Sequence, residues 1–195
     1  MMERYNKEKP IVYNTYQLYR HDKLASLKVD LAYAEKQNFY LGAKIVRGAY
    51  MEIERERANE KGYTSPIQPN KKSSDDDYNA AILFCLENID RIGFMAGTHN
   101  DQSSMLLATE MDKRSIAHNH PHVFFAQLLG MSDNLSFNLG AAGYNVAKYM
   151  PYGPVKAVMP YLFRRAQENT SAAGQTGREL SLIIKEKQRR KSLRK

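Results

Sequence analysis

Short runs of β-branched and aromatic residues alternate along the chain with amphipathic segments. Five runs, each bounded by glycine, proline or polar residues, have the composition of strands: 11–17, 42–48, 94–99, 122–127 and 145–150. Four segments between them place apolar residues at helical spacing: 23–37, 52–61, 75–91 and 101–111. The pattern therefore predicts strands and helices in alternation.

Repeated strand, helix, strand order predicts parallel pairing through right-handed crossovers, and so an α/β fold. An open doubly wound sheet usually carries a glycine-rich phosphate turn after its first strand, and the sequence has neither that turn nor a P-loop. A (β/α)8 barrel instead places its site at the carboxyl ends of its strands. The barrel is therefore the favoured fold, and because a full barrel takes ~250 residues, five strands amount to part of one.

Polar residues do cluster where the predicted strands end. A single such residue means little, because a strand end is also simply where an apolar run stops. Together, however, the polar residues at five strand ends favour a barrel mouth: Gln17, Lys44, Arg47, Thr98, His99, Asn100, Gln127 and Tyr149.

The excess of basic residues is concentrated at the C-terminus. The formal net charge is +8, but the last eleven residues carry seven basic side chains against Glu186 alone. The remainder is nearly neutral, so no nucleic-acid partner is expected. The basic run predicts a solvated helix end, or a surface for an anionic membrane.

The sequence gives weak support for a disulfide-bonded, membrane-spanning, targeted or metal-binding protein. Cys85 is the only cysteine, no run approaches the ~18 apolar residues of a spanning helix, and the N-terminus resembles no targeting segment. His118, His120 and His122 alternate, but Pro121 interrupts them and no thiol or carboxylate is close in sequence. We therefore expect no metal site.

Two adjacent arginines, Arg164 and Arg165, follow the apolar run MPYLF. Neighbouring guanidinium groups repel each other unless they face solvent or hold something negative. Adjacent residues of a helix project about 100° apart, so the pair can hold one anion from two sides. Both a solvated pair and an anion site fit this pattern.

Four motifs in chain order add a resemblance: KIVRGAY, THN, QLLGM and YLFRRAQEN. With them the chain resembles, over residues 9–169, the flavin-dependent L-proline dehydrogenases, especially the animal mitochondrial form. The resemblance implies a distorted (β/α)8 barrel that holds FAD. It also implies that residues 1–175 are the C-terminal part of that barrel, starting near its fourth strand, and that 176–195 form a basic helix or tail.

The resemblance also implies a reaction. A hydride passes from C5 of L-proline to N5 of the flavin and leaves Δ1-pyrroline-5-carboxylate, the first step of proline catabolism to glutamate. Electrons then pass to a quinone, on the matrix side of the mitochondrial inner membrane, which the basic tail would contact. The family's aspartate and lysine near the substrate belong to the part of the barrel that this chain lacks.

Site residues follow from the same resemblance. The substrate set comprises two arginines for the carboxylate, a glutamate that holds one of them, and three pocket walls: Arg164, Arg165, Glu168, Tyr149, Tyr161 and Leu128. The cofactor set is Gln17, Lys44, Val46, Arg47, Gly48, Ala49, Thr98, His99, Asn100 and Gln127. Lys44, Arg47, Arg164 and Arg165 are the expected catalytic residues, although the two cations of the KIVRGAY motif, Lys44 and Arg47, are exchanged relative to bacterial members.

Two alternatives stay open. One is a truncated chain that no longer binds FAD and serves as an interaction protein. The other is hydroxyproline dehydrogenase, against which Tyr149 argues, because those relatives look different at this position.

Overall fold

The structure is a computed structural model that describes the backbone of residues 1–171 and 173–193 and the side chains of 1–163 and 180–193. The chain divides into two compact units, Met1–Lys148 and Tyr149–Lys195, which are described one at a time. This division falls earlier than the sequence-based boundary after residue 175.

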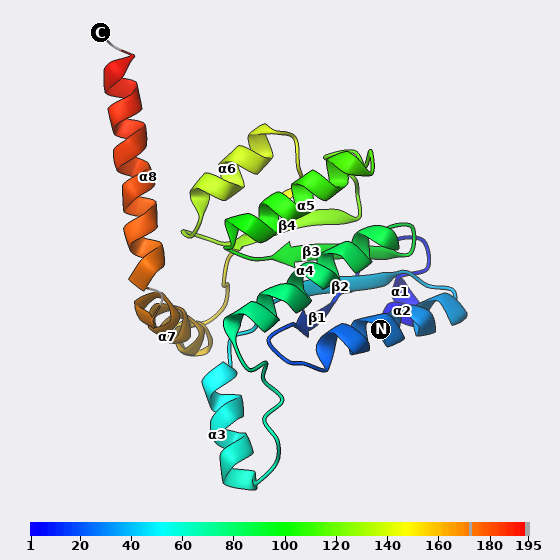
Figure 1. Ribbon diagram of the computed structural model, residues 1–195. Helices are drawn as coiled ribbons and strands as arrows, with labels where there is room; N and C mark the ends of the chain where they lie inside the picture. Colours follow the sequence, from blue (N-terminus) through cyan, green and yellow to red (C-terminus); the bar gives the residue numbers. More distant parts are fainter. Residues whose placement is uncertain (172, 194–195) are drawn as a thin grey trace. The chain divides into compact units, whose positions relative to one another are not determined.

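The first unit is built on a parallel sheet (Figure 1). Its strands are β1 (Asn14–Gln17), β2 (Leu41–Val46), β3 (Ile92–Gly97), β4 (Val123–Leu128) and β5 (Val146–Tyr149). They lie side by side in sequence order, and the pairs from β1 to β4 are parallel. Sequential order is that of a (β/α)8 barrel, whereas a doubly wound sheet reverses its order at a switch point. The predicted α/β fold, as part of such a barrel, is confirmed.

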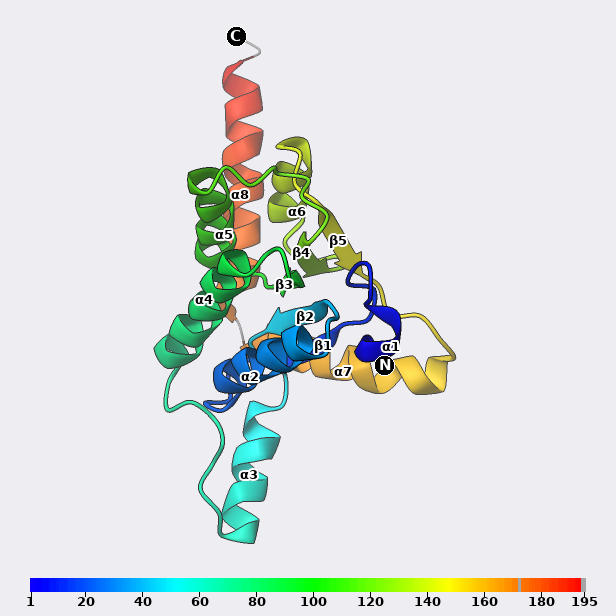
Figure 2. The ribbon, with the colours of Figure 1, turned by 90° about the vertical axis from the view of Figure 1, so that its right-hand side faces the viewer.

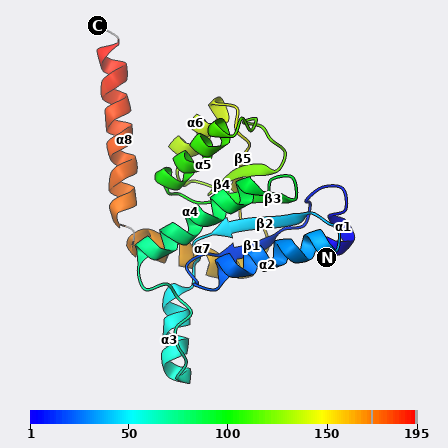
Figure 3. The ribbon, with the colours of Figure 1, turned by 45° about the vertical axis from the view of Figure 1, so that its right-hand side comes forward.

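Helices cover one face of this sheet. They are α2 (Lys23–Lys36), α4 (Lys71–Glu87), α5 (Asp101–Lys113) and α6 (Asp133–Ala141). In Figure 2, α4 and α5 lie on one side of β3 and β4, and Figure 3 shows α2 and α4 along β1 and β2. The short α1 (Met2–Tyr5) opens the chain, and α3 (Met51–Lys61) extends away from the sheet.

Alternation along the strands decides which side chains meet the helices. The core takes every second residue of the strands: Ala43 and Ile45, Phe94 and Ala96, Val123 and Phe125. Because successive side chains of a strand point to opposite faces, the residues between them lie on the other face, here called the barrel face.

Strand β1 starts three residues later than predicted because Asn6 takes over its backbone groups. The side-chain Oδ1 of Asn6 accepts from the N–H groups of Ile11 (3.0 Å) and Val12 (2.8 Å). Its Nδ2 donates to the carbonyls of Val12 (2.8 Å) and Tyr40 (2.9 Å). One buried amide thus replaces a strand partner for this segment.

Two helices also differ from the predictions, one in its first residue and one in being unpredicted. Helix α4 begins at Lys71 rather than Asp75, since the Asn70 side chain caps it by accepting from the Ser73 N–H at 2.8 Å. Helix α6 was not predicted. Its N-cap residue Ser132 has a left-handed backbone and makes no side-chain cap, so the usual sequence signal is absent.

The second unit contains α7 (Val155–Ser171), which includes Pro160, and α8 (Ala173–Ser192). The predicted substrate residues Arg164, Arg165 and Glu168 lie in α7, outside the residues whose side chains the structure describes. Among the described residues, no helix has the length and apolar character needed to cross a bilayer.

We expect Asn6→Ala to lower the free energy of unfolding by about 3 kcal/mol, because it removes the buried amide and its four part-buried hydrogen bonds to the backbone. Urea titration followed by circular dichroism measures this. Asn59→Ala is the matched control, since Asn59 is exposed on α3. Equal losses in the two variants would contradict the role assigned to Asn6.

Candidate active site

The predicted site residues at the strand ends fall into two groups. Because side chains alternate between the two faces of a strand, one group lies on the barrel face and the other faces the helices. Lys44 and Val46 alternate with the core residue Ile45 and lie on the barrel face. Gln17 and Leu128 lie there for the same reason, each next to a helix-side neighbour. The others, Arg47, Thr98 and Gln127, follow the parity of the core and face the helices.

On the helix side, Arg47 joins three elements. Its Nε donates to Asp75 Oδ1 on α4 (2.6 Å), its Nη1 to Thr98 Oγ1 after β3 (2.8 Å), and its Nη2 to Ser103 Oγ on α5 (2.9 Å). The guanidinium carbon lies 4.3 Å from the centre of the buried Tyr78 ring. The side chain is 22% exposed. Arg47 is therefore engaged with the helix layer through three separate acceptors and a cation–π contact.

Asp75 balances the charge of Arg47. Burial by itself raises the pKa of the Asp75 carboxyl group, but hydrogen bonds from Lys71 and Arg47 outweigh burial and hold the pKa below its usual value. Asp75 is thus ionised at neutral pH, and the pair is a charge-assisted hydrogen bond.

The THN motif is divided between two tasks. Asn100 caps α5, because its Oδ1 accepts from the Ser103 N–H at 3.0 Å, while its own N–H donates to Thr98 Oγ1 at 3.0 Å. His99 points elsewhere, with its Nδ1 3.0 Å from Ser132 Oγ in the loop after β4. Thr98 and Asn100 shape the turn, and His99 links neighbouring strand ends.

At the end of β4, Gln127 is only 2% exposed. Its Nε2 donates to the Thr98 carbonyl (3.3 Å) and its Oε1 accepts from Ser136 Oγ on α6 (3.0 Å). Both ends of the amide are used within the protein, so Gln127 braces β3 against α6.

The barrel face has a row of small side chains near the strand ends. Strand register aligns Gln17 with Val46, Val46 with Gly97, and Gly97 with Ala126. A Cβ atom at Gly97 would lie 2.9 Å from Val46 Cγ1 and 3.9 Å from Lys44 Cε. The Val46 side chain therefore lies close beside Gly97, and the row has the Gln17 amide at one end and Lys44 one row deeper.

Glycine is required at position 48, where the chain leaves β2. Gly48 has φ +135, and a Cβ atom there would lie 1.7 Å from Cδ1 of Tyr19. The Tyr19 N–H donates to the Arg47 carbonyl at 2.8 Å. The Gly48–Ala49 turn therefore packs directly against the loop that follows β1.

In the second unit, Tyr149 and Tyr161 lie together. Their ring centres are 5.6 Å apart and the rings are tilted by 59°. The two predicted pocket walls of this unit thus form one aromatic pair.

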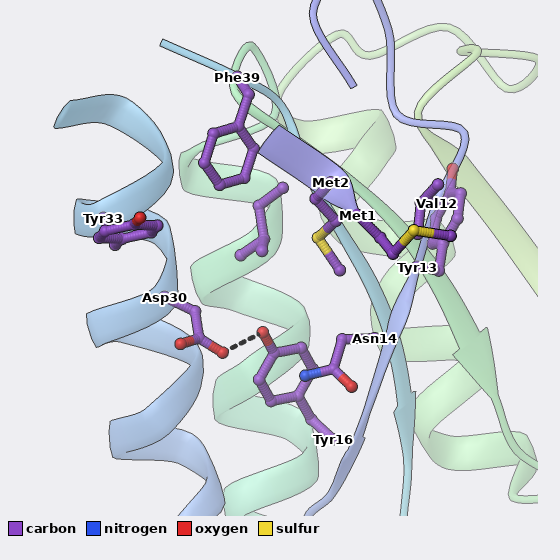
Figure 4. Close-up of a pocket in the computed structure, with 10 residues that line it drawn as sticks. Met1, Met2, Val12, Tyr13, Asn14, Tyr16, Asp30, Tyr33 and Phe39 are labelled. Atoms are coloured by element: carbon purple, nitrogen blue, oxygen red, sulfur yellow. Dashed lines mark hydrogen bonds between the residues drawn. The ribbon is translucent and has the colours of Figure 1, made fainter. Parts of the chain in front are cut away.

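One hollow of about 390 Å³ lies away from the carboxyl ends of the strands, between α1, β1 and α2 (Figure 4). Tyr16 donates a hydrogen bond from its hydroxyl group to Asp30 Oδ2 at 2.6 Å along its wall. This hollow contains none of the predicted site residues.

The histidines of the AHNHPHV segment bond within the fold. His118 contacts Asp112 Oδ1 and the Ala142 carbonyl, both at 2.8 Å, and His122 contacts the Ile89 carbonyl at 2.7 Å. No group of three possible metal ligands occurs within the described part of the chain.

Several residues of this network were missed from the sequence: Asp75, Tyr78, Asn79, Ser103, Ser132 and Lys148. Most lie on helices or in loops, and no strand-end pattern marks them. Asp75 did carry a signal, as an acidic residue near the start of a helix, but the sequence does not say which cation it meets.

Sequential parallel strands with polar residues at their carboxyl ends define the chain as part of a (β/α)8-barrel protein. A family model described as proline dehydrogenase matches residues 1–178. The chain belongs to the proline dehydrogenase family.

Curated relatives match nearly the whole chain. Proline dehydrogenase 1, mitochondrial, is 42% identical in Drosophila melanogaster and 40% identical in Homo sapiens, over 97% of this chain in both cases. Hydroxyproline dehydrogenase of Xenopus laevis is 39% identical over 97% of this chain. The chain spans 29%, 32% and 42% of the length of these three relatives.

Solved structures show the same fold. Proline utilization A from Bdellovibrio bacteriovorus, inactivated by N-propargylglycine, gives a TM-score of 0.76 at 29% identity, covering 81% of this chain and 16% of that one. A mutant of the Bradyrhizobium japonicum protein gives 0.75 at 25% identity, covering 86% and 17%.

We expect Asp75→Asn to destabilise the protein by roughly 2 kcal/mol at pH 7, because it leaves the partly buried Arg47 without its counter-ion. The pKa of Asp75 is lowered in the folded state, so its contribution is complete above pH 3.8, the ordinary value, and is lost as pH falls through the lowered pKa. Urea titrations at pH 7 and pH 3 should show the difference between wild type and variant shrinking in acid.

Asp76→Asn is the matched control, because Asp76 is 60% exposed and pairs with Lys72 on the surface of the same helix. It should change stability little. A larger loss at Asp76 than at Asp75 would contradict the central place given to Arg47.

Proposed function

We propose that this chain supplies the flavin floor and part of the substrate pocket of an FAD-dependent L-proline dehydrogenase. The carrying observation is the row of Gln17, Val46, Gly97 and Ala126 on the barrel face. Family membership and the names of the relatives support the reaction.

The residues of this row fit an isoalloxazine ring. Small side chains leave room for a flat aromatic system, and the Gln17 amide can both donate to and accept from its polar edge. Lys44 supplies positive charge on the same face. When bound, FAD would supply the two-electron chemistry that no side chain provides.

The chain's own residues have distinct tasks in this proposal. Lys44 would supply positive charge beside the edge of a bound flavin, where negative charge would be stabilised. His99 and the Gly48–Ala49 turn would hold the cofactor from the sides. Arg47, Thr98, Asn100 and Gln127 act indirectly, by holding the strand ends and helix starts in place.

Substrate binding is assigned to residues that the family resemblance supplies. Arg164 and Arg165 hold the proline carboxylate by forked, charge-assisted bonds, and Glu168 holds Arg164. Tyr149, Tyr161 and Leu128 enclose the ring. These groups orient C5 toward the flavin and exclude water, so the product is Δ1-pyrroline-5-carboxylate.

Anaerobic titration with L-proline tests the proposal on protein reconstituted with FAD. Loss of the oxidised flavin absorbance is the expected result, with D-proline as the control. Protein that holds no flavin supports the alternative of a non-catalytic interaction protein. Faster reduction by trans-4-hydroxy-L-proline supports the second candidate, which the Xenopus laevis relative favours and Tyr149 opposes.

Lys44→Met should slow flavin reduction by about a hundredfold, because a partly buried electrostatic stabiliser of developing charge is lost. Stopped-flow absorbance measures the rate. Lys36→Met is the matched control, since Lys36 is exposed at the end of α2. Equal rates in wild type and Lys44→Met would exclude Lys44 from the reacting centre.

We further propose that the electrons leave to a quinone at the matrix side of the mitochondrial inner membrane, with α8 at the lipid surface. The curated relatives are named mitochondrial. Helix α8 exposes Leu180, Ile183 and Ile184 at helical spacing, before a basic run that ends the helix. Apolar and basic groups on one helix suit an anionic bilayer.

Replacing Lys185, Lys187 and Lys191 by glutamine should weaken binding to phosphatidylserine vesicles by about 1 kcal/mol for each charge near the surface. Co-sedimentation measures the partition, and 1 M salt should weaken wild-type binding as well. Replacement of Lys7, Lys28 and Lys36 is the control. Unchanged sedimentation of the α8 variant would remove this helix from the membrane contact.

A further inference from the structure

The loop between β4 and α6, residues 129–132, has an unusual backbone. Gly130 has φ 77 and Ser132 has φ 50. A left-handed conformation is easy for glycine but costs about 1 kcal/mol or more for serine. Since Ser132 is also 6% exposed, the surrounding contacts must hold the loop in this conformation.

Lys148 on β5 supplies most of that hold. Its Nζ atom donates to the Met131 carbonyl (2.7 Å) and to Asp133 Oδ1 (2.7 Å), and lies 3.5 Å from the Leu128 carbonyl. The three acceptors belong to one short stretch that begins at Leu128 and ends at the first residue of α6. The Lys148 side chain is 24% exposed, so these bonds are partly shielded from water.

Two further contacts hold this stretch and the helix that follows it. His99 reaches Ser132 Oγ from the end of β3, and Gln127 reaches Ser136 on α6. Leu128 follows Gln127 along β4 and lies on the barrel face. The position of the Leu128 wall therefore depends on a loop that is fixed from β3, β4 and β5.

We propose that Lys148 is a positioning residue for the substrate pocket: it clamps the stretch Leu128–Asp133 and so sets the wall that Leu128 presents to the substrate ring. This inference rests on the proposed function, because that function makes Leu128 a pocket wall. It adds a residue on the helix side of β5 that determines the fit of the ring without touching it.

A purely structural lysine would affect stability alone. A positioning lysine also changes how well the substrate ring fits, because a displacement of about 1 Å in the groups around a substrate can cost on the order of a hundredfold in rate. The informative readouts are thus the KM for L-proline and the preference for L-proline over trans-4-hydroxy-L-proline, measured at a temperature where all variants are folded.

The variants are Lys148→Met, which keeps the apolar stem, and Lys148→Arg, which keeps a charged donor. Lys113→Met is the matched control, because Lys113 pairs with Glu110 on the exposed surface of α5. Lys148→Met should raise KM roughly tenfold and change the preference between the two substrates by a similar factor. Lys148→Arg should recover part of both, and Lys113→Met should match wild type.

Hydrogen exchange provides a readout that does not depend on activity. The backbone amides of residues 129–133 should exchange faster in Lys148→Met than in wild type, while those of β2 and β3 stay unchanged. Unchanged exchange in 129–133 would overturn the clamp.

Faster exchange together with unchanged KM and unchanged substrate preference would overturn the positioning role. If neither L-proline nor trans-4-hydroxy-L-proline reduces the flavin of the wild-type protein, the proposed function is overturned instead. In that case the exchange measurement alone decides whether Lys148 holds the loop.

Discussion

The guanidinium group of Arg47 is the constraint on which the site depends. An arginine keeps its charge at any physiological pH, so a partly buried one must be given acceptors by the fold around it. Here the acceptors come from the fourth helix, from the end of β3 and from α5. One side chain thus ties the end of β2 to α4, to the end of β3 and to α5.

The two faces of the strands carry different kinds of residue: those that hold the fold together face the helices, and the candidate cofactor residues face the barrel. Polar residues on the helix side, such as Thr98 and Gln127, use their hydrogen bonds within the protein. The barrel face keeps the row of Val46, Gly97 and Ala126, with Lys44 one row deeper in the sheet. Under the proposed function, such a preorganised frame costs nothing at the moment of reaction, and the polar layer contributes by holding the residues that face the barrel.

Much of the fold could be predicted from the sequence, because alternation of apolar runs reports strands and helices directly. The five strands and the barrel-like order followed from that pattern. The start of β1 did not, since the deciding partner is the Asn6 amide, which lies outside the strand. Helix α6 was missed because the loop before it is held by Lys148 and His99, which are distant in sequence.

The candidate site shows a second limit. Gln17, Thr98 and Gln127 all lie at or beside the ends of strands, so their positions in sequence look equivalent. Their directions are not, because one residue of offset moves a side chain to the other face. The sequence could name the residues at the mouth, but only the burial of their neighbours separates those that face the barrel from those that brace it.

The same alternation explains why the two cations of the KIVRGAY segment, Lys44 and Arg47, are not interchangeable. Positions 44 and 47 are three residues apart, so they lie on opposite faces. Position 47 must reach three acceptors on different elements, which the planar fork of arginine does and a single ammonium nitrogen does less well. Under the proposed function, position 44 supplies a positive charge on the barrel face, which either cation provides. When the two residue types are exchanged between relatives, the role therefore follows the position in the strand, and the quality of the helix-side network changes with the residue.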